Sequence, residues 1–291
     1  MNKHVEKAYG KINLGLDVIG RREDGYHLVK MIMQTVALHD VVTLEKVSDG
    51  KISMTTNDAT LPVNEDNLCI KAANLLKEEF GFLEGVKIHL EKNIPVAAGM
   101  AGGSTDAAAV LKGLNHMFQL GLDTEGLMER GLRLGADIPY CIMGGTALSE
   151  GIGEELTGIS PMPEVSLLIA KPPVNVSTGK VYGALDALTS YEHPDIDGMV
   201  KAIEEKNISK ICDKMGNVLA DVTMPMVPEV KELRDTMLDY GATGAMMTGS
   251  GPTVFGFFED ETALENCYEF LKKKNHCERL YKTAIQNDID E

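Results

Sequence analysis

A glycine- and alanine-rich segment, Pro95 to Thr105, has the residue types that bind phosphate groups. A strand pattern precedes it and a helix pattern follows it, and Gly99, Gly102 and Gly103 let the backbone approach an anion closely. The first turn of the following helix adds N–H groups and the positive end of its dipole. The segment is not a Walker A loop, because no Gly-Lys-Ser/Thr closes it, and it is not a GxGxxG fingerprint. It is either a phosphate-binding loop or a flexible turn before an ordinary helix.

A second glycine-rich element, TGSGP at 248–252, lies between two apolar strand patterns. Taken alone, it is typical of a tight hairpin turn. Together with the first loop, it could line the same phosphate site from another part of the chain.

Two charged residues stand beside apolar segments. Lys11 opens the amphipathic strand pattern GKINLGL, and a cation next to core positions is notable there. A lysine in such a place more often extends its ammonium group into solvent from an edge strand. Asp137, in LGADIP, follows a predicted helix end in a loop that Pro139 stiffens. Alone, it is typical of a turn aspartate that binds nearby backbone.

The composition is that of a folded, acidic protein. The 291 residues include 44 acidic and 28 basic side chains, which gives a formal net charge of −16. Nucleic acid and anionic membrane surfaces attract basic patches, so we expect neither as a partner. No apolar run approaches membrane-spanning length, and the opening MNKHVEKAYGK lacks the apolar region of a secretory signal. Five scattered cysteines without a CxxC pair indicate reduced thiols in a cytoplasmic protein.

Strand and helix patterns alternate irregularly along the chain, which favours an α+β protein in two lobes over a doubly wound sheet. The Pro/Gly-rich, acidic interval from Gly151 to Glu164 is the best candidate for a boundary, so we predict domains at 1–155 and 156–291. The predicted elements are strands at 12–18, 86–90 and 165–170, helices at 68–80 and 124–135, a loop at 136–139, and a strand–turn–strand unit at 245–258.

Four motifs, in this order along the chain, resemble those of the GHMP small-molecule kinases. They are AYGKINLGLDVIGRREDGYH, IPVAAGMAGGSTDAAAVLKGLN, LGADIPY and MMTGSGPTVF, and the resemblance runs from Lys7 to about Phe258. It implies a two-lobed α+β fold, with an N-terminal mixed α/β lobe that binds ATP, a C-terminal ferredoxin-like α+β lobe, and the active site in the cleft. The chain departs from the family at Tyr9-Gly10, where Pro or Ser followed by Ala usually precedes the lysine.

The resemblance implies a role for each matched residue. The first loop would hold the ATP phosphates through main-chain amides, and Asp137 would accept the proton of the attacking hydroxyl. Lys11 would keep Asp137 ionised and stabilise charge on the phosphoryl group. Mg²⁺ would accompany ATP, with the hydroxyl of Ser104 or Thr105 as a candidate ligand beside water and phosphate oxygens. The implied ATP-binding residues are Pro95, Val96, Ala97, Ala98, Gly99, Met100, Ala101, Gly102, Gly103, Ser104 and Thr105.

The DGYH turn indicates a branch of the family whose acceptor carries a cytidine diphosphate group. Tyr26 and Tyr182 would stack on the cytosine, His27 would hydrogen-bond its edge, and Asn13 and Thr178 would line the pocket. The implied reaction is ATP-dependent phosphorylation of the 2-hydroxyl of 4-diphosphocytidyl-2-C-methyl-D-erythritol, in the non-mevalonate route to isoprenoid precursors. Without the resemblance, His27 is typical of a surface turn and Tyr182 of a helix core. Two alternatives stay open: another GHMP kinase, acting on a sugar or a mevalonate-like acid, and a non-catalytic nucleotide-binding module on the same fold.

Overall fold

The computed structural model describes residues 2–289 and divides into two compact units. The boundary predicted between residues 155 and 156 falls inside the second unit and stays a prediction. Unit 1 comprises the described part of Met1–Gly10 together with His39–Val96 and Ala101–Gly144, and unit 2 comprises Lys11–Leu38, Ala97–Met100 and the described part of Gly145–Glu291.

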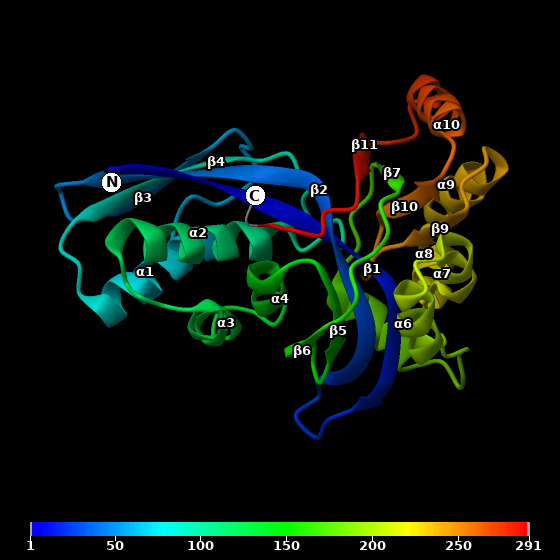
Figure 1. Ribbon diagram of the computed structural model, residues 1–291, viewed down its shortest axis with the longest axis horizontal. Coiled ribbons are helices and arrows are strands. Elements are labelled where there is room, and N and C mark those ends of the chain that lie inside the picture. Colours follow the sequence, from blue (N-terminus) through cyan, green and yellow to red (C-terminus); the bar gives the residue numbers. More distant parts are fainter. Residues whose placement is uncertain (1, 290–291) are drawn as a thin grey trace. The chain divides into compact units, whose positions relative to one another are not determined.

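Unit 1 is a sheet covered by helices (Figure 1). Two long strands, β1 (Lys3–Arg21) and β2 (His27–Val47), contribute to both units. In unit 1, β4 (Gly85–Glu91) pairs antiparallel with the end of β2, and β3 (Ile52–Thr56) pairs parallel with β4. Buried and exposed residues alternate along β4, because one face of the sheet packs against the helices and the other does not.

Two helices, α1 (Leu68–Phe80) and α2 (Gly102–Phe118), pack on each other and close the core of unit 1. The predicted helix at 68–80 is confirmed. Asn67 caps its start, since its side-chain oxygen accepts the N–H of Cys69 at 2.9 Å. Gly81 ends it with a left-handed backbone (φ 67°), which glycine adopts without steric cost.

The next two helices correct the sequence-based boundaries. The predicted helix at 124–135 is α3 (Thr124–Leu132), and its cap is Asp123, whose carboxylate accepts the N–H of Gly126 at 2.8 Å. The loop predicted at 136–139 is confirmed at 136–137 and wrong at 138–139, because a further helix, α4 (Ile138–Met143), begins there. Pro139 stands in its first turn, where the missing N–H and the fixed φ of proline suit a helix start.

Unit 2 contains a ferredoxin-like lobe (Figure 1). Its four-stranded antiparallel sheet has the order β11-β7-β10-β9, so in chain order the strands lie 4-1-3-2. Helix α9 (Pro228–Asp239) packs on β9 and β10, and α10 (Glu261–Lys274) packs on β7, β10 and β11. This arrangement confirms the predicted lobe. The strands are β7 (Ser166–Lys171), β9 (Gly244–Met247), β10 (Val254–Phe258) and β11 (Arg279–Ala284).

The other elements of unit 2 surround β1 and β2. Strand β5 (Thr146–Glu150) pairs with β2 and with β6 (Glu155–Gly158), and β8 (Gly216–Asn217) pairs parallel with β1. Over residues 2–289, no helix has both the length and the apolar composition needed to cross a membrane. The remaining helices are α5 (Thr178–Leu185), α6 (Ile196–Glu204), α7 (Ile208–Lys214) and α8 (Ala220–Met226).

Candidate active site

The predicted phosphate loop has an unusual backbone. Ala97, Gly99 and Ala101 all have positive φ, of 51°, 72° and 56°. Left-handed residues within a turn form the concave sets of N–H groups that bind anions. Ala101 is the N-cap of α2 and forms no side-chain cap hydrogen bond, so no capping side chain occupies the first-turn amides of this helix.

The second glycine-rich element lies against Gly99 within unit 2. A Cβ placed on Gly99 would lie 2.3 Å from the carbonyl oxygen of Thr248, and one on Gly249 would lie 3.0 Å from that of Gly99. The Thr248 hydroxyl also donates to the Gly99 carbonyl at 3.3 Å. The two segments therefore meet backbone to backbone, a contact that only glycine permits at Gly99.

Lys11 is buried and turned toward this loop. Its ammonium group donates to the side-chain oxygen of Asn13 at 2.6 Å and to the carbonyl of Gly99 at 3.1 Å. Its backbone N–H donates to the carbonyl of Met100 at 3.2 Å. With 6% of its surface exposed and its ammonium group bound to Asn13 and Gly99, Lys11 is not a lysine that reaches into solvent. The preceding Tyr9-Gly10 leaves β1 unbroken.

Asn13 belongs to the same network and is fully buried. Its backbone N–H donates to the hydroxyl of Thr248 at 3.0 Å, and its amide nitrogen faces the sulfur of Met31 at 3.3 Å. A thioether sulfur is a weak acceptor, so this amide keeps most of its capacity to donate to a stronger one.

Three of the residues predicted to bind the acceptor, His27, Thr178 and Tyr182, lie in or against α5 in unit 2. The rings of His27 and Tyr182 lie 4.6 Å apart, centroid to centroid, at 33°. The hydroxyl of Thr178 lies 2.9 Å from that of Ser250, in the second glycine-rich turn. Tyr26 is 60% exposed, so its ring is accessible for stacking on a ligand. The His27 side chain is only 13% exposed, so it is not a surface turn residue.

Asp137 is the N-cap residue of α4, in unit 1. Its carbonyl accepts the N–H of Cys141 at 3.1 Å, which begins the helix, but its side chain forms no cap hydrogen bond. The interpretation as a turn aspartate whose side chain binds nearby backbone is therefore not supported at the cap. Because the Asp137 carboxylate does not cap α4, the start of this helix does not depend on it, and it can accept a proton from another group.

Two carboxylates and one lysine, none of which a sequence motif predicted as site residues, are buried together near the two ends of the phosphate loop. The ammonium group of Lys92 contacts both Asp40 and Asp106, at 2.8 Å in the second case. The other oxygen of Asp40 accepts the N–H of Ile94 at 2.7 Å, just before the loop. Near the other end, within the loop, a Cβ on Gly102 would lie 2.9 Å from the Lys92 nitrogen. One sequence signal could have indicated this cluster: Asp106 stands next to three alanines on the buried face of α2, where a charged residue needs a partner.

The Lys92 cluster is one positive charge short of neutrality unless one acid holds a proton. Burial, opposed by Lys92 and assisted by the charge of Asp40, raises the pKa of Asp106 well above its ordinary value. Burial lowers the pKa of Lys92, but the two carboxylates outweigh this effect and raise it. One oxygen of Asp106 is buried without a hydrogen-bond partner, which also disfavours the ionised form. Burial therefore favours a proton on Asp106, beside the ion pair of Lys92 and Asp40.

We expect Asp106→Asn to stabilise the protein increasingly as pH rises. The unfolded chain loses the Asp106 proton near about pH 4, whereas the folded protein keeps it to higher pH. Between these values the unfolded state binds fewer protons, so wild-type stability falls with rising pH, and asparagine removes this loss. Urea unfolding of both proteins from about pH 4.5 to 8 measures the difference.

Asp235→Asn is the control of opposite sign. Hydrogen bonds from Lys231 and Arg234 lower the pKa of Asp235, so its carboxylate contributes stability that is present above the unfolded pKa and lost as pH falls. If Asp106→Asn instead destabilises the protein at neutral pH, Asp106 is ionised and paired with Lys92.

The hydroxyls offered for Mg²⁺ are not equivalent. Thr105 is buried and donates its hydroxyl to the carbonyl of Tyr9 at 2.7 Å, so Ser104 is the better-suited ligand. Within the described residues, no group of three His, Cys, Asp or Glu side chains could hold a metal ion. A hydroxyl beside phosphate oxygens and water fits Mg²⁺, which usually retains several waters.

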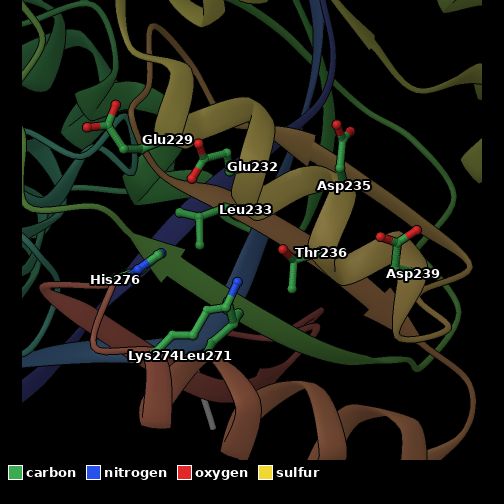
Figure 2. A pocket seen from close by; sticks show the side chains of 9 residues that line it. All are labelled: Glu229, Glu232, Leu233, Asp235, Thr236, Asp239, Leu271, Lys274 and His276. Atoms are coloured by element: carbon green, nitrogen blue, oxygen red, sulfur yellow. The ribbon is translucent and has the colours of Figure 1, made fainter.

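A pocket in unit 2 contains none of the predicted site residues, and its lining differs from theirs in charge (Figure 2). Four acidic residues of α9 line it, with Leu271, Lys274 and His276 at its other side. A wall of carboxylates repels phosphate groups, so its chemistry does not suit ATP or a diphosphate. The acids are Glu229, Glu232, Asp235 and Asp239.

Comparison with known proteins identifies the family. The family model described as "GHMP kinases N terminal domain" matches residues 67–145, and "GHMP kinases C terminal" matches 199–277. A protein of Lachnospira eligens named 4-diphosphocytidyl-2-C-methyl-D-erythritol kinase is 51% identical over 277 residues, which cover 95% of this chain and 96% of that protein. The chain belongs to the GHMP kinase family. A protein of Caldicellulosiruptor bescii with the same name is 50% identical to this GHMP kinase, over 91% of the chain and 93% of that protein.

Solved structures agree with this assignment. A crystal structure of 4-(cytidine 5'-diphospho)-2C-methyl-D-erythritol kinase matches 98% of this GHMP kinase and 100% of that chain, at 31% identity and a TM-score of 0.84. Homoserine kinase from Cytophaga hutchinsonii matches with a TM-score of 0.77 at 18% identity, which shows the fold alone. The predicted family, its α+β fold with a mixed N-terminal lobe, and its class as an ATP-dependent kinase are thus confirmed.

Proposed function

We propose that this GHMP kinase transfers the γ-phosphoryl group of ATP to the 2-hydroxyl of 4-diphosphocytidyl-2-C-methyl-D-erythritol. The observation that carries the proposal is the identity of about half, over nearly the whole of both chains, with relatives that bear the name of this kinase. The ring pair of Tyr182 and His27, the last residue of the DGYH motif, supports a base-binding pocket. A sugar or a mevalonate-like acid would have no use for such a pair.

The mechanism follows from the residue types. Main-chain amides of the loop Pro95–Thr105 and of the first turn of α2 bind the phosphate oxygens. The Asp137 carboxylate takes the proton of the acceptor hydroxyl as its oxygen attacks the γ-phosphorus, and ADP leaves with the bond electrons. The Lys11 ammonium stabilises negative charge on the transferred group. Phosphoryl transfer needs mainly positioning and charge neutralisation, which these groups supply.

We further propose that ATP binds together with Mg²⁺, and that the hydroxyl of Ser104 is the protein's ligand to the ion. When bound, the ion neutralises phosphate charge and fixes the geometry of the triphosphate. The partners are then ATP and a small cytidine diphosphate acceptor, and a cytoplasmic location stays a prediction.

The deciding experiment is an ADP-release assay over a panel of hydroxyl acceptors, with and without a cytidine diphosphate group. The proposal expects turnover with 4-diphosphocytidyl-2-C-methyl-D-erythritol and none with homoserine, mevalonate or galactose. Turnover with one of these three alone would indicate another GHMP kinase. ATP binding without any turnover would favour a nucleotide-binding module.

Removal of one aromatic platform is expected to weaken acceptor binding selectively. Tyr26→Ala and Tyr182→Ala should each cost about 1–3 kcal/mol of acceptor affinity, if stacking here resembles that on single-stranded nucleic acids. Acceptor KM rises while the KM for ATP does not, because the stacked base belongs to the acceptor alone. Steady-state kinetics with each substrate varied in turn measures both constants.

Tyr240→Ala is the matched control for these variants. Tyr240 stacks on Phe270 at 4.7 Å, at the end of α9, and belongs to no proposed site. An equal rise of acceptor KM in all three variants would assign the effect to general destabilisation and not to stacking.

A further inference from the structure

One carboxylate, Asp186, joins three elements around the proposed base pocket. It is the C-cap residue of α5, and its backbone N–H donates to the carbonyl of Tyr182 at 3.0 Å. One carboxylate oxygen lies 2.7 Å from Nε2 of His27, at the start of β2, and the other lies 3.1 Å from Nη1 of Arg21, at the end of β1. All four residues belong to unit 2.

We propose that Asp186 is a positioning residue that holds His27 with Nε2 protonated, so that Nδ1 accepts a hydrogen bond from the cytosine amino group. The inference rests on the proposed function, because it assigns the hydrogen-bond polarity of the same pocket. It deepens that function by naming the residue that sets the choice between cytosine and uracil.

The polarity of the contact follows from the charge of Asp186. The hydrogen bond from His27, with the charge of Arg21 beside it, lowers the pKa of Asp186, so this carboxyl group is ionised at neutral pH. An ionised carboxylate can only accept, so Nε2 must carry a proton. In the neutral imidazole, Nδ1 is then an acceptor.

This acceptor distinguishes the two pyrimidines at one position. Cytosine has an amino group at C4, which donates, whereas uracil has a carbonyl there, which accepts. An Nδ1 lone pair binds the amino group and repels the carbonyl, and an unpaired polar contact at a largely buried side chain is costly. The low exposure of the His27 side chain, 13%, makes water a poor substitute for the missing partner.

The same carboxylate also fixes the ring geometry. Tyr182 and Asp186 are four residues apart in α5, so they lie on one face of the helix. With Asp186 bound to His27, the Tyr182 ring is held 4.6 Å from the imidazole. Loss of the carboxylate therefore alters both hydrogen bonding and stacking.

Asp186→Asn is the sharpest test, because asparagine keeps the shape but has one acceptor oxygen. The Arg21 guanidinium can only donate, so it takes that oxygen, and the amide N–H₂ turns toward His27. Nε2 must then accept, and Nδ1 becomes the donor. The variant should raise KM for the cytidine acceptor about 10-fold or more and lose preference over the uridine analogue, with kcat and the KM for ATP within about two-fold.

A direct readout accompanies the kinetics. Long-range ¹H–¹⁵N NMR spectra of the imidazole nitrogens distinguish the two tautomers of His27, assigned with His27→Gln. We expect the Nε2–H form in the wild type and the Nδ1–H form in Asp186→Asn. Asp186→Ala, which removes the partner altogether, should weaken the preference without reversing the tautomer.

Asp235→Asn is the control, since Asp235 is a surface carboxylate that also binds an arginine and lies in the pocket of Figure 2. It should change neither KM. An unchanged cytidine preference in Asp186→Asn, or an Nδ1–H tautomer in the wild type, overturns the inference. If the wild type does not phosphorylate the cytidine acceptor, the proposed function fails instead, and the tautomer measurement still decides the role of Asp186.

Discussion

Asp137→Asn is expected to lower kcat by about 10²–10⁴-fold, the usual contribution of a general base. Asparagine has the shape of aspartate but cannot take the proton from the acceptor hydroxyl. The fold should persist, because the Asp137 side chain forms no cap hydrogen bond with α4. Binding of a non-hydrolysable ATP analogue should also persist, and calorimetry measures it beside the turnover assay.

The neighbouring helix supplies a matched control. Asp123 caps α3 through its side chain, and asparagine caps a helix about as well as aspartate. Asp123→Asn should therefore leave both kcat and stability nearly unchanged. Turnover of Asp137→Asn within a few-fold of wild type would remove Asp137 from the mechanism.

Gly103→Val is expected to abolish ATP binding with little effect on folding. A Cβ at Gly103 meets only Leu68 Cδ1, at 3.8 Å, so the protein can accommodate the side chain. Gly103 is exposed in the first turn of α2, beside the N–H groups proposed to bind phosphate. A branched side chain there would hold the phosphate oxygens away from those amides. Calorimetric titration with a non-hydrolysable ATP analogue measures the loss.

Substitutions at two other glycines distinguish a loss of ATP binding from a loss of stability. At Gly158, in β6, a Cβ meets nothing within 4 Å, so Gly158→Val should bind ATP normally. At Gly99, a Cβ would lie 2.3 Å from the Thr248 carbonyl oxygen, so Gly99→Ala should lose stability as well as affinity. Unchanged ATP affinity in a folded Gly103→Val protein would show that the loop has only a structural role.

Local chemistry explains why much of the fold was predictable. The α1 helix could be placed from its periodicity, from Asp66 or Asn67 as a possible cap and from Gly81 as its end, since all of these act within a few residues. The turn between β9 and β10 followed in the same way from its glycines. Helix α4 was missed because it has only six residues, too few for a period to show.

Motif order determined the family, and the family implied the roles of Lys11 and Asp137. The sequence alone could not distinguish a buried lysine from one extended into solvent, because burial depends on neighbours distant along the chain. Lys11 is held by Gly99, 88 residues away, and the Lys92 ammonium by Asp40, 52 residues away.

The sequence by itself determined the glycine-rich loops, the capped helices and the DGYH turn, since each depends on residues close together along the chain. Only the tertiary structure decided which charges share a buried site. It brought Asp186 to His27, 159 residues apart, and it left Asp106 beside two charged partners. Hydrogen-bond polarity and protonation depend on such long-range contacts, because desolvation and neighbouring charges act through space and not along the sequence.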